Sequence, residues 1–382
     1  MKKFGRFLAV AMAATMCLAG FASCKKESDT YKIGMSGPLT GGAALYGKAV
    51  QNAAQLAVDE INAAGGLNGT KLELVALDDA NDAKKVETNY AQLLKRGVHV
   101  TLGCVTTKPA LEFKGLAEED NLFYLTPSAS ADAVPNGKNG FQMCFADSNQ
   151  GKAAAVDYVN EAYKGQTIGV LYRSDDAYSK GIYEQFKANL ASDITLVEAS
   201  FQTEAPTDLS SQISTLKDCR FVFLPIYYTP AALFMTQAKG VIADDAVYYG
   251  CDGLDGIDSA EGFDINSIPQ EVSMLSHFNS KATEGKAKEF IDKYTTKYGT
   301  DTLNQFGASA YDCVYAIYEA LKAAGDKVNT GMSASEICTV LRGEFNGGFT
   351  FSGVTGSNIT WNASGYVEKA AVRYIVKEAT KK

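Results

Sequence analysis

Two short turns rich in hydroxyl groups contain the first residues of the chain that could bind a ligand. Val105-Thr106-Thr107 follows one apolar, strand-like run, and Ser128-Ala129-Ser130 follows the next. Hydroxyl groups beside the free amides of a helix N-terminus make a site for a small anion such as a carboxylate. Simple N-capping by Thr107 and Ser130 explains the same residues equally well. A carboxylate site and two ordinary caps therefore stand as alternatives.

A second group of candidate residues follows strand-like runs further along the chain. Tyr178, Tyr227 and Asp252 each lie just beyond such a run. An aspartate that faces a cleft can pair with an ammonium group, and tyrosine rings can form an amphipathic wall. The alternatives are an ordinary turn at Asp252-Gly253 and chance placement of tyrosine, of which the chain has 20.

Other kinds of chemistry lack their usual residues. The chain has two histidines, His99 and His277, and neither belongs to an HExxH motif or a Cys/His cluster. The segment 42–49 satisfies GxxxxGK, but Ala49 stands where a phosphate loop needs Ser or Thr for magnesium. GxGxxG, GxSxG and CxxC are absent. We therefore expect neither an enzyme nor a metal or other cofactor.

The net charge of −8 and the pI near 5.1 disfavour nucleic acid and basic-patch membrane binding as partners. At 382 residues, with 46% of them hydrophobic, the chain is long enough for two folded units.

Alternating apolar runs and helical patterns predict the elements that position these side chains. A helix with its apolar face at Val50, Ala54, Ala57, Val58 and Ile61 should stop at Gly65-Gly66. Other helices are expected at 83–96, 110–119, 286–298, 306–324 and 334–342, and a β-like segment at 348–376. Strands are expected at 31–35, 71–77, 98–103, 122–125, 167–172, 194–201, 221–224, 246–249 and 272–276. This order predicts an α/β fold with doubly wound parallel sheets, and no Pro/Ser-rich linker separates the two series.

The N-terminus resembles a bacterial lipoprotein signal. Lys2, Lys3 and Arg6 precede an apolar stretch at 7–22, which is too short for a comfortable transmembrane span, and Cys24 falls where cleavage would occur. The signal would be residues 1–23, and residues 24–30 would form a lipidated tether. A cleaved secretory signal with an incidental cysteine is the alternative. Both interpretations put the folded part outside the cytoplasm.

Several segments, taken in order, resemble the leucine/isoleucine/valine-type solute-binding proteins of bacterial ABC importers. The matching segments are 33–41 (IGMSGPLTG), 57–69 (AVDEINAAGGLNG), 125–130 (LTPSAS), 237–239 (QAK) and 250–253 (GCDG). The resemblance implies the type I periplasmic binding protein fold, with two doubly wound lobes joined by three hinge crossings. The crossings would fall near Asp147, Asn279 and Thr350. Lobe 1 would then comprise 31–147 and 280–350, and lobe 2 would comprise 148–279 and 351–382.

The same resemblance assigns roles to the polar candidates. Thr106, Thr107 and Ser130 would hold the α-carboxylate of an amino acid. The carbonyl group of Ser128 and the carboxylate of Asp252 would hold its ammonium group. Many relatives have Glu where Asp252 stands, so the ammonium would sit deeper or be reached through water.

The resemblance also assigns the walls of the site. Tyr46, Tyr178 and Tyr227 match ring positions that flank the ligand, and Val105 matches an apolar wall.

These observations together predict a binding protein without chemistry of its own. It would capture a free amino acid, branched-chain or otherwise hydrophobic, and deliver it to an ABC permease as a lipid-anchored monomer on the outer side of the cell membrane. A binder of an amide, urea or another small polar solute is the alternative ligand class, and a sensory ligand-binding protein is the alternative role.

Overall fold

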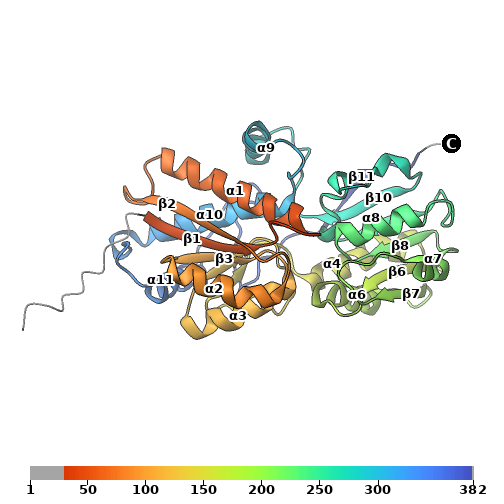
Figure 1. Ribbon diagram of the computed structural model, residues 1–382, viewed down its shortest axis with the longest axis horizontal. Coiled ribbons are helices and arrows are strands. Elements are labelled where there is room, and N and C mark those ends of the chain that lie inside the picture. Colours follow the sequence, from red (N-terminus) through yellow and green to blue (C-terminus); the bar gives the residue numbers. More distant parts are fainter. Residues whose placement is uncertain (1–29, 381–382) are drawn as a thin grey trace, which may run out of the picture.

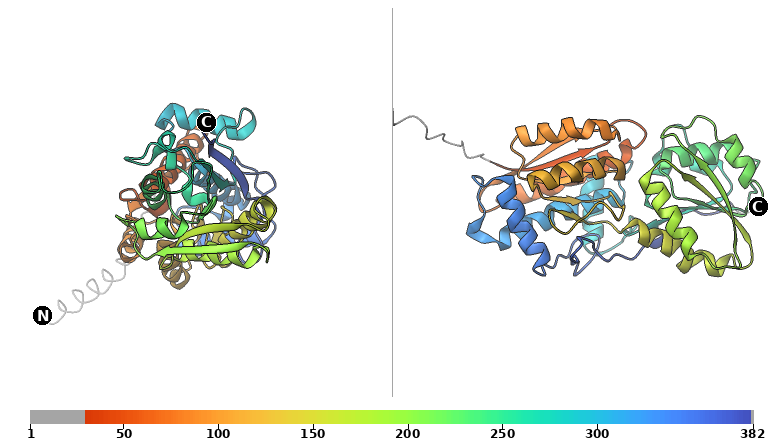
Figure 2. Two further views of the ribbon diagram at one scale, coloured as in Figure 1. Left: turned by 90° about the vertical axis from the view of Figure 1, so that its right-hand side faces the viewer. Right: turned by 90° about the horizontal axis from the view of Figure 1, so that it is seen from below.

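Buried parallel strands form the centres of two separate sheets. The computed structural model describes residues 30–380, and Figures 1 and 2 show them as two lobes that lie side by side along the long axis. In the first lobe the strand order is β2-β1-β3-β4-β5, and in the second it is β11-β10-β9-β8-β6-β7. The predicted fold class, α/β with two doubly wound sheets, is confirmed.

The first sheet is entirely parallel. Its strands are β1 (Thr30–Gly37), β2 (Lys71–Asp78), β3 (Val100–Cys104), β4 (Tyr124–Thr126) and β5 (Gly140–Gln142). All residues of β3, β4 and β5 are buried, because helices cover the sheet on both faces. The helices of this lobe are α1 (Ala44–Ala63), α2 (Val86–Lys95), α3 (Thr107–Asp120), α9 (Gly285–Tyr298), α10 (Gln305–Ala323) and α11 (Ala334–Asn346).

Helix α1 illustrates how the sequence pattern becomes packing. The five apolar residues that predict its buried face are all at most 2% exposed, and α1 packs along α10. The helix ends at Ala63, and Gly65 and Gly66 follow with φ of +106° and +74°. Glycine adopts such positive φ values at little steric cost, so this pair ends the helix as predicted.

The second sheet is parallel except at one edge. Its strands are β6 (Thr167–Arg173), β7 (Thr195–Phe201), β8 (Phe221–Leu224), β9 (Val247–Gly250), β10 (Glu271–Ser276) and β11 (Val372–Lys377). Its helices are α4 (Asp147–Ala153), α5 (Asn160–Ala162), α6 (Ala177–Asn189), α7 (Ser210–Leu216) and α8 (Tyr228–Gln237). Strand β11 pairs antiparallel with β10, so the all-parallel expectation is wrong at this edge.

The C-terminal segment is less regular than expected. Within 348–376 only β11 is a strand, and the remainder holds isolated bridges between Phe351 and Ile359 and between Trp361 and Val367. The short strand β5, which the sequence pattern does not predict, is three residues long and borders this segment.

The chain passes between the sheets after β5, after β10 and before β11. The third passage was expected near Thr350. However, the Trp361 ring nitrogen donates to the backbone of Gln142 in β5, and Gly365 accepts from the same residue. We therefore propose that residues 351–367 belong to lobe 1 and that the third crossing lies between Val367 and β11.

None of the helices among residues 30–380 combines the length and apolar character needed to cross a membrane. The predicted signal and tether, including Cys24, lie outside the described residues.

Candidate functional site

The strand order of each sheet locates the place where a ligand site is favoured. In open α/β sheets, ligands bind beyond the carboxyl ends of strands on either side of the point where the strand order reverses. That point lies between β1 and β3 in the first sheet and between β6 and β8 in the second. The segments that follow these four strands contain Tyr46, Val105, Tyr178 and Tyr227.

The two hydroxyl turns of lobe 1 are linked by hydrogen bonds. The Thr126 hydroxyl donates to the carbonyl of Cys104 at 3.1 Å, and the Ser128 hydroxyl donates to the carbonyl of Val105 at 2.6 Å. These bonds hold the turn after β4 against the turn after β3. The proton of the Ser128 hydroxyl is therefore used within the protein, so this hydroxyl is not available as a donor to a ligand carboxylate.

The remaining hydroxyl groups of these turns do not cap a helix. Helix α3 begins at Thr107, and its N-cap residue Thr106 makes no side-chain capping bond. No helix begins at Ser130, and its segment continues as a loop to α4. The hydroxyl oxygens of Thr106, Thr107 and Ser130 are buried and have no partner among the described residues. The capping explanation is therefore wrong, and three buried hydroxyl groups remain free to bind something else.

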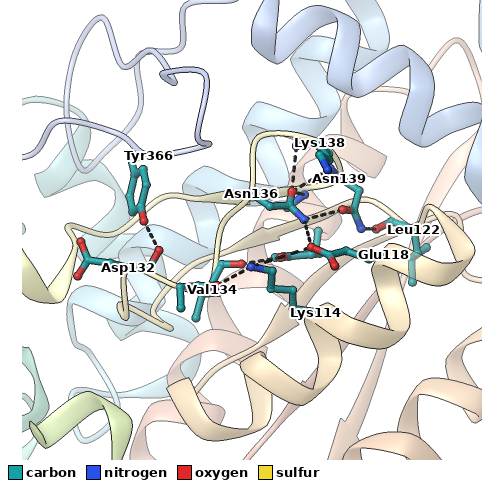
Figure 3. Close-up of polar contacts among 12 residues, drawn as sticks. Lys114, Glu118, Leu122, Asp132, Val134, Asn136, Lys138, Asn139 and Tyr366 are labelled. Atoms are coloured by element: carbon teal, nitrogen blue, oxygen red, sulfur yellow. Dashed lines mark hydrogen bonds and ion pairs between the residues drawn. The ribbon is translucent and has the colours of Figure 1, made fainter. Parts of the chain in front are cut away.

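The loop after Ser130 is tied to helix α3, as Figure 3 shows. Lys114 donates to the carbonyl of Ala133 at 2.7 Å, and the Asn136 amide donates to Glu118 at 2.8 Å. The Tyr366 hydroxyl donates to the carbonyl of Asp132 on the same loop. These contacts fix the loop on the lobe 1 side and so position the hydroxyl turn that precedes it.

Asp252 provides a buried carboxylate from lobe 2. It follows β9 at the start of a short 3₁₀ turn and is 1% exposed. Its Oδ1 accepts from the Tyr178 hydroxyl at 2.7 Å, and its backbone N–H donates to Gln150 at 3.0 Å. Its Oδ2 is buried without a partner among the described residues. Burial raises the pKa of the Asp252 carboxyl group to about 6, although the hydrogen bond from Tyr178 opposes the rise.

Asp147 is a second buried acid beside this site, and from the sequence it was expected only to mark a crossing. It is the first residue of α4 and is 2% exposed. Its N–H donates to the carbonyl of Ser130 at 2.9 Å, while both carboxylate oxygens lack a partner among the described residues. Burial raises the pKa of the Asp147 carboxyl group well above its ordinary value, and the nearby Asp252 adds to the rise. Its position on a crossing places it between the two lobes.

All nine residues predicted to contact a ligand line one cavity between the lobes. They are Tyr46, Val105, Thr106, Thr107, Ser128, Ser130, Tyr178, Tyr227 and Asp252. Gly253 and Phe306 also line it and were not predicted. The volume of this cavity is about 10 Å³. A cavity of that size holds about one water molecule, so the lobes are closed upon each other here.

Aromatic rings form the apolar part of the cavity wall. The Tyr46 ring lies edge-on to Tyr227 and Phe306, with centroid distances of 5.4 and 4.8 Å, and Tyr178 lies 5.0 Å from Tyr227. Phe306 is the second residue of α10, where the sequence pattern marks it only as a core residue. The only feature of the sequence that indicates Gly253 is the Asp-Gly turn. A Cβ atom added at Gly253 would lie 2.5 Å from the Tyr178 hydroxyl, which is too close for a side chain.

Tyr46 also links the two lobes directly. Its hydroxyl donates to the carbonyl of Gly253 and accepts from the backbone N–H of Tyr228 at 3.2 Å. Next to it, the Thr229 hydroxyl donates to the carbonyl of Gly42 at 2.6 Å. These contacts connect the start of α1 in lobe 1 with the start of α8 in lobe 2, so they exist only when the lobes are closed.

The described residues contain no cluster of His, Cys, Asp or Glu suited to a metal ion. The cysteines at positions 104, 144, 219, 251, 313 and 338 are buried free thiols. Burial raises the pKa of the Cys104 thiol and of the Cys251 thiol, both of which lie next to the site in sequence. A raised thiol pKa lowers the fraction of reactive thiolate, so neither group is a prepared nucleophile.

Comparison with known proteins agrees with this geometry. Residues 30–368 match the sequence model of the family described as "Periplasmic binding protein". The chain is 30% identical over 321 residues to the leucine-, isoleucine-, valine-, threonine- and alanine-binding protein of Pseudomonas aeruginosa, covering 82% of this chain and 83% of that protein. It is 28% identical over 316 residues to the Leu/Ile/Val-binding protein BraC3 of Rhizobium johnstonii, covering 81% and 83% of the two chains.

A solved structure extends the likeness to three dimensions. It is the branched-chain amino acid transporter substrate binding protein LivJ from Streptococcus pneumoniae in complex with isoleucine. The TM-score is 0.78 at 27% identity, and the alignment covers 92% of this chain and all of that one.

Proposed function

The chain belongs to the periplasmic binding protein family, and we propose that it captures a free aliphatic amino acid between its lobes and delivers it to an ABC permease. Membership of this solute-binding family implies that the protein functions outside the cytoplasm. The proposal includes no chemical step and no cofactor, and the protein acts as a monomer.

The observation that carries the proposal is a set of buried polar atoms without partners in one cavity. Hydroxyl groups of Thr106, Thr107 and Ser130 come from lobe 1, and Oδ2 of Asp252 comes from lobe 2. Each such group costs about 1–3 kcal/mol when left unpaired. An amino acid zwitterion can pair with all of these groups, because its carboxylate accepts from the hydroxyl groups and its ammonium donates to the Asp252 carboxylate.

The apolar wall supports an aliphatic side chain. Val105, Tyr227 and Phe306 line the same cavity, and the first two come from different lobes. A hydrocarbon side chain placed against them loses water contact without leaving a polar group unpaired. The named binding of leucine, isoleucine, valine, threonine and alanine by the Pseudomonas aeruginosa relative is consistent with that choice.

Capture proceeds by lobe movement. The cavity of about 10 Å³ admits no amino acid, so entry needs the lobes to separate and release the Tyr46 contacts to lobe 2. The ligand then favours closure by satisfying groups from both lobes. In the closed form the two lobes have one fixed relative orientation, and this is the form that binds the permease.

We also propose that Cys24 is lipidated and anchors the folded part by the tether 24–30. Basic residues, an apolar stretch and small residues precede Cys24 in the sequence. The several acyl chains of a bacterial lipoprotein give stable attachment, whereas one chain gives only reversible binding.

A thermal-unfolding panel of free amino acids, their amides and urea tests the proposed ligand class. A ligand at 100 times its Kd adds about 2.7 kcal/mol to the free energy of unfolding, which is an easily measured shift. We expect leucine, isoleucine or valine to stabilise the protein more than leucinamide does. Stabilisation by amides or urea alone would favour a polar-solute binder, and no shift with any free amino acid would overturn the proposal.

A further inference from the structure

A second, larger groove lies where the chain passes between the lobes. Its volume is about 950 Å³, and no residue of the cavity described above lines it. Its walls are residues 276–279 of the second crossing and residues between Thr355 and Tyr374 of the C-terminal segment. Part of that wall contacts lobe 1 through Trp361, and part belongs to β11 in lobe 2. The shape of the groove therefore depends on how the lobes are oriented.

Glu368 and Arg373 line this groove with opposite charges, and Arg373 pairs with Glu271. Lys369 also lines it and has no direct ion pair within residues 30–380. Its ammonium donates to the Thr355 hydroxyl at 2.6 Å, and no carboxylate pairs with it among the described residues. The nearby Asp312 carboxylate is instead taken up by the backbone N–H groups of Val354 and Thr355 and by the Thr355 hydroxyl. Burial lowers the pKa of the Lys369 ammonium to about 8, so it stays mainly protonated at neutral pH. A lysine held in this way can still pair with an anion.

His277 adds an unpaired polar atom to the same groove. Its Nε2 is 2.7 Å from the Ser309 hydroxyl, and its ring lies edge-on to Phe145 at 4.8 Å. Its Nδ1 is buried and has no partner among the described residues. A buried nitrogen without a partner is unfavourable, as are the unpaired hydroxyl groups of the cleft.

The groove also has an exposed apolar wall. Val372 lines it and is 60% exposed, the highest value among the four exposed large hydrophobic residues of the described part of the chain. Phe278, which is only 6% exposed, and Tyr374, whose ring lies 4.8 Å from the Lys281 ammonium, line the groove as well. A cationic group beside an uncovered apolar surface suits a molecule that has an acid group and an apolar body.

We propose that this groove is a second ligand site, for a small organic anion with an apolar body that pairs with Lys369. Because residues of both lobes line the groove, an anion bound there changes the equilibrium between open and closed lobes. It therefore changes the affinity of the interlobe cavity for its amino acid. This coupling is reciprocal. The coupling, but not the anion binding, rests on the function proposed above.

The single tryptophan of the chain makes the site directly observable. Trp361 lines the groove, so selective excitation of tryptophan fluorescence reports binding there. The probe is phenylacetate, and the matched control ligand is phenylacetamide, which has the same size and no charge. We expect a saturable fluorescence change with phenylacetate and at least about tenfold weaker binding of phenylacetamide, which is typical of a lost charge-assisted hydrogen bond.

Three variants test whether phenylacetate binds in the groove or in the cavity, and whether its binding depends on the charge of Lys369. Lys369→Met should weaken phenylacetate binding about tenfold or more, whereas Lys217→Met, at an exposed lysine of lobe 2 outside the groove lining, should not. Thr106→Val removes one of the cavity hydroxyl groups that would hold a carboxylate there, and it should not abolish phenylacetate binding. Equal binding of acid and amide by the wild-type protein would overturn the proposal, as would loss of phenylacetate binding in Thr106→Val. The acid and amide comparison remains decisive if Lys369→Met does not fold.

Coupling is measured as the Kd of leucine with and without saturating phenylacetate. A change of a few fold in either direction supports it, and an unchanged Kd refutes coupling while leaving the anion site intact. Failure of leucine to bind at all would instead refute the proposed function of the cleft, and the fluorescence titration would still test the groove.

Discussion

Replacing Asp252 by Asn should change ligand affinity and protein stability in opposite directions. The substitution keeps the size of the side chain and an oxygen that can accept from the Tyr178 hydroxyl, but it removes the negative charge. A hydrogen bond to a charged group contributes about 1.5–3 kcal/mol, so the affinity for leucine should fall about 10- to 150-fold. Isothermal titration calorimetry at pH 7 measures this loss.

The stability of the ligand-free protein should rise instead. The pKa of the buried Asp252 carboxyl group is about 6, above the value near 4 in an unfolded chain. Since folding raises this pKa, ionisation opposes folding: the penalty is absent below pH 4, grows between pH 4 and 6, and is complete above pH 6. Two pKa units correspond to up to about 3 kcal/mol, which Asp252→Asn relieves at pH 7 but not at pH 4. Urea denaturation at the two pH values measures the difference.

The same pKa gives leucine binding a pH dependence. Below pH 6 the free Asp252 takes up a proton that the ammonium of the ligand must displace, so affinity should fall by up to about tenfold per pH unit. Asp252→Asn should reduce this dependence, and any dependence that remains comes from Asp147, whose pKa is also raised. Asp258→Asn, an exposed acid in the same segment, serves as the control and should alter neither affinity nor stability. Unchanged affinity together with lower stability in Asp252→Asn would show that the acid is structural and refute our reasoning.

Three further substitutions test other parts of the scheme. Tyr46→Phe removes the hydroxyl that bonds to Gly253 and Tyr228 in the closed form. Calorimetry should show leucine affinity lowered about fivefold, which is equivalent to about 1 kcal/mol. Unchanged affinity would mean that this contact does not favour closure. Thr106→Val keeps the shape of the side chain but removes an unpaired hydroxyl. Leucine affinity should therefore fall about tenfold or more, while the urea midpoint of unfolding stays the same or rises. An unaltered Kd for leucine would show that Thr106 does not contact the ligand. Cys24→Ser should move the protein from the detergent phase to the aqueous phase in a phase-partition experiment on cells, and continued partition into detergent would contradict lipidation at Cys24.

Parts of the fold were readable from the sequence because they depend on local patterns. Buried parallel strands appear as apolar runs, and the face of α1 appears as apolar residues at helical spacing. The antiparallel edge strand β11 and the three-residue β5 were not readable in this way. Their pairing depends on neighbours far away in the sequence, and β5 is too short to show a period. The position of the third crossing likewise depends on contacts of Trp361 with a strand more than two hundred residues earlier.

The candidate site shows the same division. The hydroxyl turns and the Asp-Gly turn follow apolar runs directly, and so their place at the edge of a sheet is predictable from the order of residues alone. Asp147 could not be singled out from its neighbours, because its significance lies in two carboxylate oxygens that find no partner among the described residues of the folded chain. Phe306 fits the apolar pattern of α10, so the sequence does not distinguish it from the core residues of that helix or predict its place in the cavity wall.

The unpaired groups also explain how the two lobes can respond to a ligand at all. Closure without a ligand gains the Tyr46 and Thr229 contacts between the lobes, but it buries Thr106, Thr107, Ser130 and Asp252 without partners among the described residues. At about 1–3 kcal/mol for each of these four groups, the cost exceeds the roughly 0.5–1.5 kcal/mol that each of the three direct hydrogen bonds contributes, so closure without a ligand is unfavourable. A zwitterion removes most of that cost without changing the direct contacts. The differential affinity that drives closure therefore comes from polar groups that the folded chain leaves unsatisfied.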